Sequence, residues 1–446
     1  MLCPGKRPLR RRWRFLAVFA AVMALAASPS FAINGYFMNG YGPKANGVGG
    51  AGVAMPQDTN VTTVNPAGMH GVEPGYDVYF RFMHPQRDAA IDCRGIGACT
   101  SVVEDASSRE FFAVPGFGYV RHLNEKFAAG ISMYANGGLN STFDRPIYAE
   151  ALARIQGLRP GQRGFKTSGK VGVDLGQFIA APSLSYSVNQ YLDVGISPLF
   201  SIIKFKSYGF ESFRPLSSDP TSLTNRGSEY VMGGGVRVGL IGHLSKSLKV
   251  GAQYTSKLRH SKFTKYNGLF PDNGKFETPR HYSIGLSWQA LSNLTFAFDI
   301  HQIQFATVAV TGNSGPRLNE FVNGFTAPRL LGSEAGIGFG WRNQTVFKFG
   351  AVYRFSDRIT FRLGWNGADQ TTARNQTLFG LVSPSSFRDH ITGGMSIRLG
   401  EHTELSWGYM HAFDAERRDP SSPLLGAGAK ANFAGDALDI GISRTF

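Results

Sequence analysis

Apolar and polar residues alternate along most of the chain from Gly75 to the C-terminus. Near the end, Leu438, Ile440 and Ile442 alternate with Asp439, Gly441 and Ser443. Because successive side chains of a β-strand point to opposite faces, this period of two predicts strands with one apolar, aromatic face and one small, polar face. The apolar face would point inward in a soluble sandwich and outward in a membrane barrel, so alternation alone leaves both architectures open.

The connections between the alternating segments distinguish the two architectures. Short links of about two residues, such as Asn124-Glu125 and Ser356-Asp357, follow every second segment, whereas the other links are long, including 137–174 and 310–341. The segments are 75–84, 110–121, 126–136, 175–188, 192–206, 228–243, 248–257, 279–290, 294–309, 342–355, 359–367, 390–399, 404–413 and 436–446. An even strand number with short turns at one end and long loops at the other is typical of bacterial outer-membrane barrels, whose closure leaves no unpaired edge in lipid. We therefore predict an all-β, transmembrane antiparallel β-barrel of about 14 strands.

The N-terminus predicts export. Six basic residues between Lys6 and Arg14 precede the apolar run Phe15–Ala27, which ends in Ser30-Phe31-Ala32. This order is that of a secretory signal peptide, so we expect residues 1–32 to be removed near Ala32, with an uncleaved anchor as the alternative. The rest of the net charge of +15 is spread over the chain without aromatic platforms, which favours contact with lipopolysaccharide or a basic lumen over nucleic-acid binding.

Residues 33–74 do not alternate and precede the barrel, predicted at 75–446. They contain Asn65-Pro66-Ala67 and the glycines Gly47, Gly49, Gly50 and Gly52. The interior of such a barrel is too wide for its own side chains to fill, so this segment is expected to fold back as a plug, or hatch. The alternative is an ordinary turn leading into the first strand.

The glycine-rich stretch 45–54, Asp58 and the Asn65-Pro66-Ala67 motif resemble the hatch of the FadL family, which also includes toluene and xylene channels. The resemblance implies a channel, not an enzyme, that takes up long-chain fatty acids by hatch-gated diffusion, with aromatic hydrocarbons as the alternative. It implies capture by the outer loops, a pocket in the barrel and sideways release. Gly50 departs from the pattern, since relatives often have arginine there. The terminal Phe446 fits recognition by the barrel assembly machinery, and we expect a monomer.

Basic side chains are expected in the lumen, where they would suit a carboxylate head group or an anion-biased porin. The inward positions of the alternation are Arg81, Arg237, Lys249, Lys348, Arg354, Arg362 and Arg398. Three prolines interrupt predicted strands at Pro115, Pro182 and Pro198. Because proline donates no ladder hydrogen bond, these prolines predict either tolerated bulges or a lateral opening in the wall.

The remaining candidate chemistry is sparse. Cys93 and Cys99 are expected to form a disulfide in the first outer loop after export, and without nearby histidine they make a poor metal site. An outer-membrane hydrolase is disfavoured, because G-x-S-x-G is absent and Asp299 with His301 has no neighbouring nucleophile. The G-x-G-x-x-G pattern at Gly47–Gly52 has no strand before it or helix after it, so no nucleotide or other cofactor is expected.

Overall fold

The computed structural model describes residues 34–158, 169–317, 320, 324–383, 388–422 and 426–446. The expected signal peptide and its cleavage at Ala32 lie outside these residues. No helix in this described part of the chain is long and apolar enough to cross a membrane.

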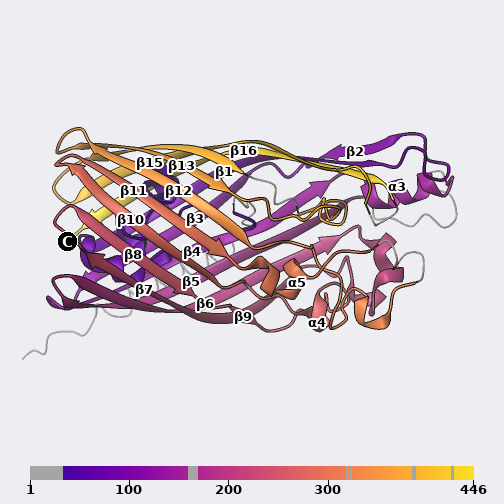
Figure 1. Ribbon diagram of the computed structural model, residues 1–446, viewed down its shortest axis with the longest axis horizontal. Coiled ribbons are helices and arrows are strands. Elements are labelled where there is room, and N and C mark those ends of the chain that lie inside the picture. The colour runs from indigo at the N-terminus through magenta and orange to yellow at the C-terminus, as the bar shows by residue number, and fades with distance from the viewer. Residues whose placement is uncertain (1–33, 159–168, 318–319, 321–323, 384–387, 423–425) are drawn as a thin grey trace, which may run out of the picture.

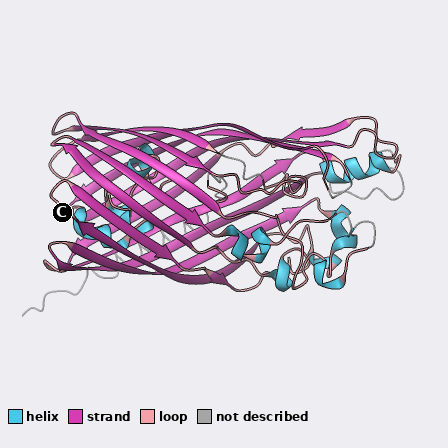
Figure 2. Ribbon diagram, in the orientation of Figure 1, coloured by secondary structure: helices cyan, strands magenta, loops and turns pink. Residues whose placement is uncertain are grey.

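Fourteen antiparallel strands form one closed barrel, as the alternation predicted (Figures 1 and 2). Each strand pairs with its neighbour along the chain, and β16 pairs with β1 to close the sheet. The strands are β1 (Gly75–Asp92), β3 (Phe112–His122), β4 (Phe127–Phe143), β5 (Val171–Asn189), β6 (Leu192–Tyr208), β7 (Glu229–His243), β8 (Leu248–Thr255), β10 (His281–Leu291), β11 (Leu294–Ile303), β12 (Gln344–Arg354), β13 (Ile359–Ala368), β14 (Asp389–Arg398), β15 (Thr403–Asp419) and β16 (Gly428–Thr445).

The long-loop end differs from the prediction in detail. Strands β1, β4, β5, β15 and β16 run further than expected, and two short strands, β2 (Val102–Ala106) and β9 (Arg259–His260), pair with β1 and β7. In contrast, β11 ends at Ile303, earlier than the predicted end at residue 309. The residues after it form η5 (Phe305–Thr307) and α5 (Ala309–Gly312). The extensions stand above the apolar belt, where no lipid requires an apolar outer face. There the alternation is inverted, and the apolar residues lie on the inward, buried face: Val171, Val173 and Leu175 on β5, and Ala429, Ala431 and Phe433 on β16.

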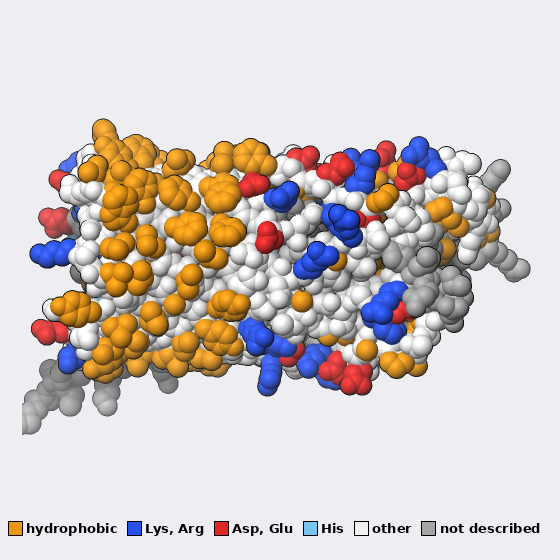
Figure 3. Space-filling view, viewed as in Figure 1, with side chains coloured by type: hydrophobic (Ala, Val, Ile, Leu, Met, Phe, Trp, Pro, Cys, Tyr) orange, Lys and Arg blue, Asp and Glu red, His pale blue; other side chains and the backbone are white. Residues whose placement is uncertain are grey.

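Exposed apolar side chains are found on strands all around the barrel. On the face shown in Figure 3 they form a belt, with charged groups beyond it at both ends. Phe361, Leu363 and Trp365 are 42%, 65% and 37% exposed. The side chain of the intervening Arg362 points inward to Gln57 and Ser396. The register predicted from the alternation is therefore confirmed on β13, and the belt is the surface that would face lipid.

Residues 34–74, the hatch, fold inside the barrel near the short-turn end. They contain α2 (Pro43–Gly47), η1 (Thr59–Thr63) and η2 (Pro66–Gly71). The side chains of Asp58 and Asn65 accept hydrogen bonds from Asn60 N and Ala67 N and so cap the two 3-10 helices. The helical turns at the other end are α3 (Ile147–Ile155), η3 (Glu211–Leu216), η4 (Pro220–Ser222), α4 (Pro271–Gly274) and η6 (Ala327–Arg329).

Candidate functional site

The Asn65-Pro66-Ala67 motif joins the hatch to the wall. Asn65 Nδ2 donates to Val53 O at 2.8 Å in the hatch and to Leu240 O at 3.1 Å on β7. The facing wall is made of glycine: a Cβ on Gly239 would lie 2.0 Å from Asn65 Oδ1, and one on Gly195 would lie 2.4 Å from Ala67 N. The motif and these glycines together allow the hatch backbone to approach the wall closely.

The hatch glycines have a similar role on the opposite wall. Gly49 and Gly50 have φ of 66° and 79°, and a Cβ on Gly49 would lie 2.5 Å from Trp365 O. Gly47 lies against Gly394, and Gly52 N donates to Asp299 Oδ2 at 2.7 Å. The glycine-rich stretch therefore packs tightly against the wall, which explains its glycines without a phosphate-binding loop.

Buried wall carboxylates hold the hatch, among them Asp299 and Asp439. Asp299 accepts hydrogen bonds from the backbone N–H groups of Gly52 and Val53. Asp439 accepts one from Asn46 Nδ2 at 2.7 Å and pairs with Arg81 at 2.9 Å. The Asp299–His301 pair considered for hydrolysis is thus occupied by the hatch, with His301 Nδ1 within 2.8 Å of the Ser283 hydroxyl.

Several basic residues predicted for the lumen also contact the hatch. Arg237 Nη1 donates to Thr62 O at 2.8 Å, and Lys348 Nζ donates to Asn39 O at 2.7 Å. Arg362 Nε donates to Gln57 at 2.8 Å. Together with Arg81, these side chains have protein partners, so they are not free to bind a carboxylate head group. Lys249 is half-buried on β8, apart from this set.

One hatch-to-wall ion pair escaped the sequence analysis. Lys44 Nζ lies 2.7 Å from Glu404 on β15. Burial opposes the charge of Lys44, but Asp77, Glu404 and Asp58 together raise its pKa. Lys44, six residues before Gly50, thus supplies a salt bridge between hatch and wall. No sequence signal relates Lys44 to Glu404, which is 360 positions away.

An apolar pocket of about 40 Å³ lies at the long-loop end. Leu139, Leu175 and Phe205 stand in register on β4, β5 and β6 and form one side. Loop residues close the other side, namely Phe210, Leu269, Phe270, Pro271, Phe276, Val310, Ile337, Gly338, Phe339, Phe379, Val382 and Ser383, with Val173 of β5 beside them. The described lining residues include no charged side chain. No sequence pattern predicts this pocket, because its loop residues come from segments without periodicity.

The wall has a gap between β3 and β4. Their backbone pairing ends at Phe117 and Met133, and among the described residues it resumes at the isolated bridge between Ser107 and Phe143. Pro115 lies on the edge of this gap, paired with Phe80 of β1 on its other side. The hatch reaches the gap from inside, where Met38 N donates to Asn136 O at 3.0 Å at a bulge of β4.

Pro182 and Pro198 mark a second interruption, between β5 and β6. Pairing is lost between Ala180–Phe200 and Leu184–Ile196. Here the hydroxyls of Ser183 and Ser197 lie 2.6 Å apart inside the wall and bridge the interruption. The two proline sites therefore differ: the β3–β4 gap is long, whereas the β5–β6 break is short and cross-linked by serines.

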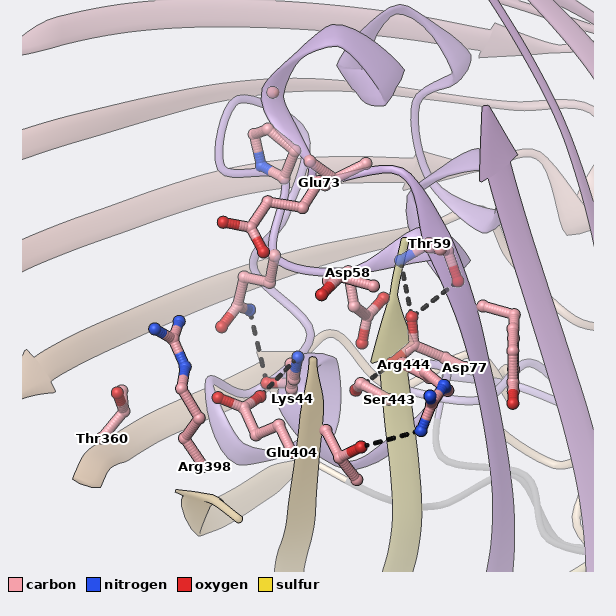
Figure 4. Close-up of a pocket in the computed structure, with 18 of the residues that line it drawn as sticks. Lys44, Asp58, Thr59, Glu73, Asp77, Thr360, Arg398, Glu404, Ser443 and Arg444 are labelled. Carbon is pink, nitrogen blue, oxygen red and sulfur yellow. Dashed lines mark hydrogen bonds and ion pairs between the residues drawn. The ribbon is translucent and has the colours of Figure 1, made fainter. Parts of the chain in front are cut away.

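A polar cavity of about 400 Å³ opens at the short-turn end, below the hatch (Figure 4). Arg354, Arg362 and Arg398 line it together. The sequence predicted each as a lumen residue, and the fold places them on one wall. Burial, then the neighbouring Asp77, raises the pKa of Asp58 on the hatch side to about 7.

The outer segment between β1 and β2 contains a disulfide. Cys93 and Cys99 are bonded, with their Cα atoms 5.7 Å apart. Among the described residues, no group of three or more His, Cys, Asp or Glu side chains is placed to hold a metal ion.

A closed barrel with an apolar outer belt, a plug tied to its wall and an apolar pocket among its outer loops defines the class of plugged outer-membrane channels. The chain belongs to the outer membrane protein transport family that comprises OMPP1, FadL and TodX, whose profile matches residues 17–421. It is therefore an outer-membrane channel for hydrophobic substrates, and its family consists of transport proteins. Among curated proteins, none matches the sequence.

Solved structures share the fold. The Pseudomonas putida toluene transporter TodX has a TM-score of 0.64 and 16% identity, over 92% of this chain and 99% of that one. A Pseudomonas aeruginosa FadL homologue has a TM-score of 0.63 and 14% identity, over 92% of this chain and 100% of that one. The Ralstonia pickettii toluene transporter TbuX has a TM-score of 0.56 and 17% identity, over 92% of this chain and 99% of that one. At these identities the likeness concerns the fold.

Proposed function

We propose that the channel takes up hydrophobic compounds that carry no charge, such as monoaromatic hydrocarbons, by diffusion through the outer pocket. The observation that carries this proposal is the pocket lining, where side chains of leucine, valine, isoleucine and phenylalanine surround the space and the described residues present no charge. An ionised ligand would lose its hydration there without gaining a partner. The small free volume means that ring side chains must move when a ligand binds.

Long-chain fatty acids, which the sequence analysis placed first, are the second candidate. The basic residues expected to receive their carboxylate are mostly bound to the hatch, as with Arg237 and Lys348. One observation still favours a carboxylate: Arg354 and Arg398 line an open cavity on the far side of the hatch. A fatty acid would have to pass the outer pocket in its neutral form or with its head group in water.

The route out is proposed to be lateral. The β3–β4 gap lies beside the hatch residue Met38 and is filled by apolar side chains, so an apolar ligand that displaced them would reach lipid without crossing the polar mouth. Release follows when the N-terminal hatch residues leave Asn136. An anion-biased porin is less consistent with a lumen in which Arg81, Lys348 and Asp439 are all bound to hatch or wall partners.

Uptake of labelled toluene and labelled oleate by cells producing equal amounts of folded protein tests the proposal. Leu175→Gln places an amide in the pocket and should lower toluene uptake roughly tenfold, because an unpaired polar group in apolar surroundings costs about 1–3 kcal/mol. Leu123→Gln is the matched control, since Leu123 is 57% exposed at the short-turn end. Faster uptake of oleate than of toluene would favour the second candidate, and equal uptake by cells lacking the channel would contradict both.

A further inference from the structure

The cavity at the short-turn end has one strongly basic wall. Arg354, Arg362 and Arg398 come from the neighbouring strands β12, β13 and β14, all from inward positions near the strand ends. Figure 4 shows Arg398 without a marked contact, while Lys44 and Glu404 face each other. The space of about 400 Å³ in front of this wall is open to solvent and large enough for a small molecule.

The guanidinium groups are not equally occupied. Arg362 donates from Nε to Gln57 and from Nη1 to Ser396, at 2.8 Å and 2.7 Å, so its position is fixed. Within the part of the chain that the structure describes, Arg354 and Arg398 make no side-chain hydrogen bond or ion pair. Two such groups beside a fixed third create a positive field with donors left over for an anion.

The carboxylates nearest to this wall already have partners. Glu404 is opposite Arg398 in the strand register, but it pairs with Lys44 at 2.7 Å. Asp77 accepts hydrogen bonds from the N–H and hydroxyl of Thr59. Glu73 and Glu401 remain exposed at the rim, where water screens them. Among the described residues, no carboxylate of the cavity forms an ion pair with Arg354 or Arg398, although Glu404 and Arg398 interact electrostatically at longer range.

Apolar surface lies next to the arginines. Val352 precedes Arg354 on the same inward face of β12, and Met55 of the hatch packs near it. We propose that this mouth is a binding site for a carboxylate carried on a short apolar chain, with Arg354 and Arg398 binding the carboxylate and Met55 and Val352 contacting the chain. The site is independent of what the outer pocket accepts, because the hatch separates the two.

Calorimetric titration of the full mature protein in lipid nanodiscs with hexanoate tests the site, with empty nanodiscs as the blank. Hexan-1-ol has the same chain without the charge, and inorganic phosphate has the charge without the chain. The wild type should bind hexanoate saturably and more tightly than either. In Arg354→Gln/Arg398→Gln the affinity for hexanoate should fall roughly tenfold or more, since charge-assisted hydrogen bonds are lost.

Arg121→Gln/Arg358→Gln is the matched control, because both residues are exposed outside the cavity at the same end of the barrel. It should bind hexanoate as the wild type does. Four results would each overturn the assignment. They are an equal loss of hexanoate affinity in the control variant, unchanged affinity in the cavity variant, no saturable binding to the wild type, and phosphate binding as tight as that of hexanoate. None of these readouts involves transport, so failure of the proposed uptake function would be recorded separately by the toluene and oleate assay.

Discussion

At the scale of single residues, buried polar side chains of the wall hold the hatch in the lumen, and some of them also have a partner in the wall. Asp439 is the clearest case, because it is fully buried and binds both Arg81 of β1 and Asn46 of the hatch. A buried charge that loses its partner is costly, whereas an exposed pair contributes little. Such residues therefore both hold the hatch in place and contribute to the stability of the barrel.

We expect Asp439→Ala to destabilise the protein by about 3–5 kcal/mol, since Arg81 would stay buried without its counter-ion. Urea unfolding of the protein in liposomes measures the change. Asp436→Ala on the same strand removes the exposed pair with His411 and should cost about 0–1 kcal/mol. If both variants lost a similar free energy of unfolding, the buried Arg81–Asp439 pair would contribute no more to stability than the exposed pair.

At the scale of elements, the hatch is the part whose stability is separable from that of the barrel. It has three short helical turns and little regular hydrogen bonding of its own, so wall contacts set its position. Asn65 joins the fold of the hatch to its attachment, because its side chain bonds Val53 O and Ala67 N within the hatch and Leu240 O on β7 of the wall. The barrel strands pair with one another without it.

Asn65→Ala should loosen the hatch by about 2–3 kcal/mol, since it removes three hydrogen bonds of about 1 kcal/mol each. In planar bilayers the variant should show frequent ionic openings where the wild type conducts little, with unchanged heat resistance of the barrel. Asn432→Ala, in a surface groove beside Asp88 and Lys430, is the control. A wild type that conducts salt as freely as a general porin would contradict the plug, and a silent Asn65 variant would contradict the role of this residue.

At the scale of the whole molecule, the proposed ways out for a ligand are the β3–β4 gap and the polar mouth. The gap is bounded by apolar residues such as Val114 and Ala135, which lie in one buried cluster with Met38 of the hatch. The mouth is lined by ionisable side chains, including Arg398 and Glu404. An apolar ligand is therefore expected to leave through the gap.

Joining cysteines at Val114→Cys and Ala135→Cys with dibromobimane should block toluene uptake while toluene binding to the purified protein persists. The native Cys93–Cys99 disulfide keeps its thiols out of the reaction. Ala252→Cys and Ile284→Cys, in register on the paired strands β8 and β10, give a control cross-link that should leave uptake intact. Undiminished uptake across the closed gap would rule out the lateral route.

The sequence by itself determined the barrel, its strand number, the face of each strand and the turn pattern, because alternation and connection length are local properties that lipid and pairing impose on every strand. The inward position of Arg362 and the outward position of Leu363 followed from that alone. Only the tertiary structure decided which inward groups have partners: Lys348 meets Asn39 O and Lys44 meets Glu404 through contacts between distant segments. It also decided the outer pocket, since Phe205 and Phe270 meet there only after the barrel closes and the loops pack over it. Pairing between neighbours leaves a repeating signal in the sequence, whereas close packing between remote segments leaves none.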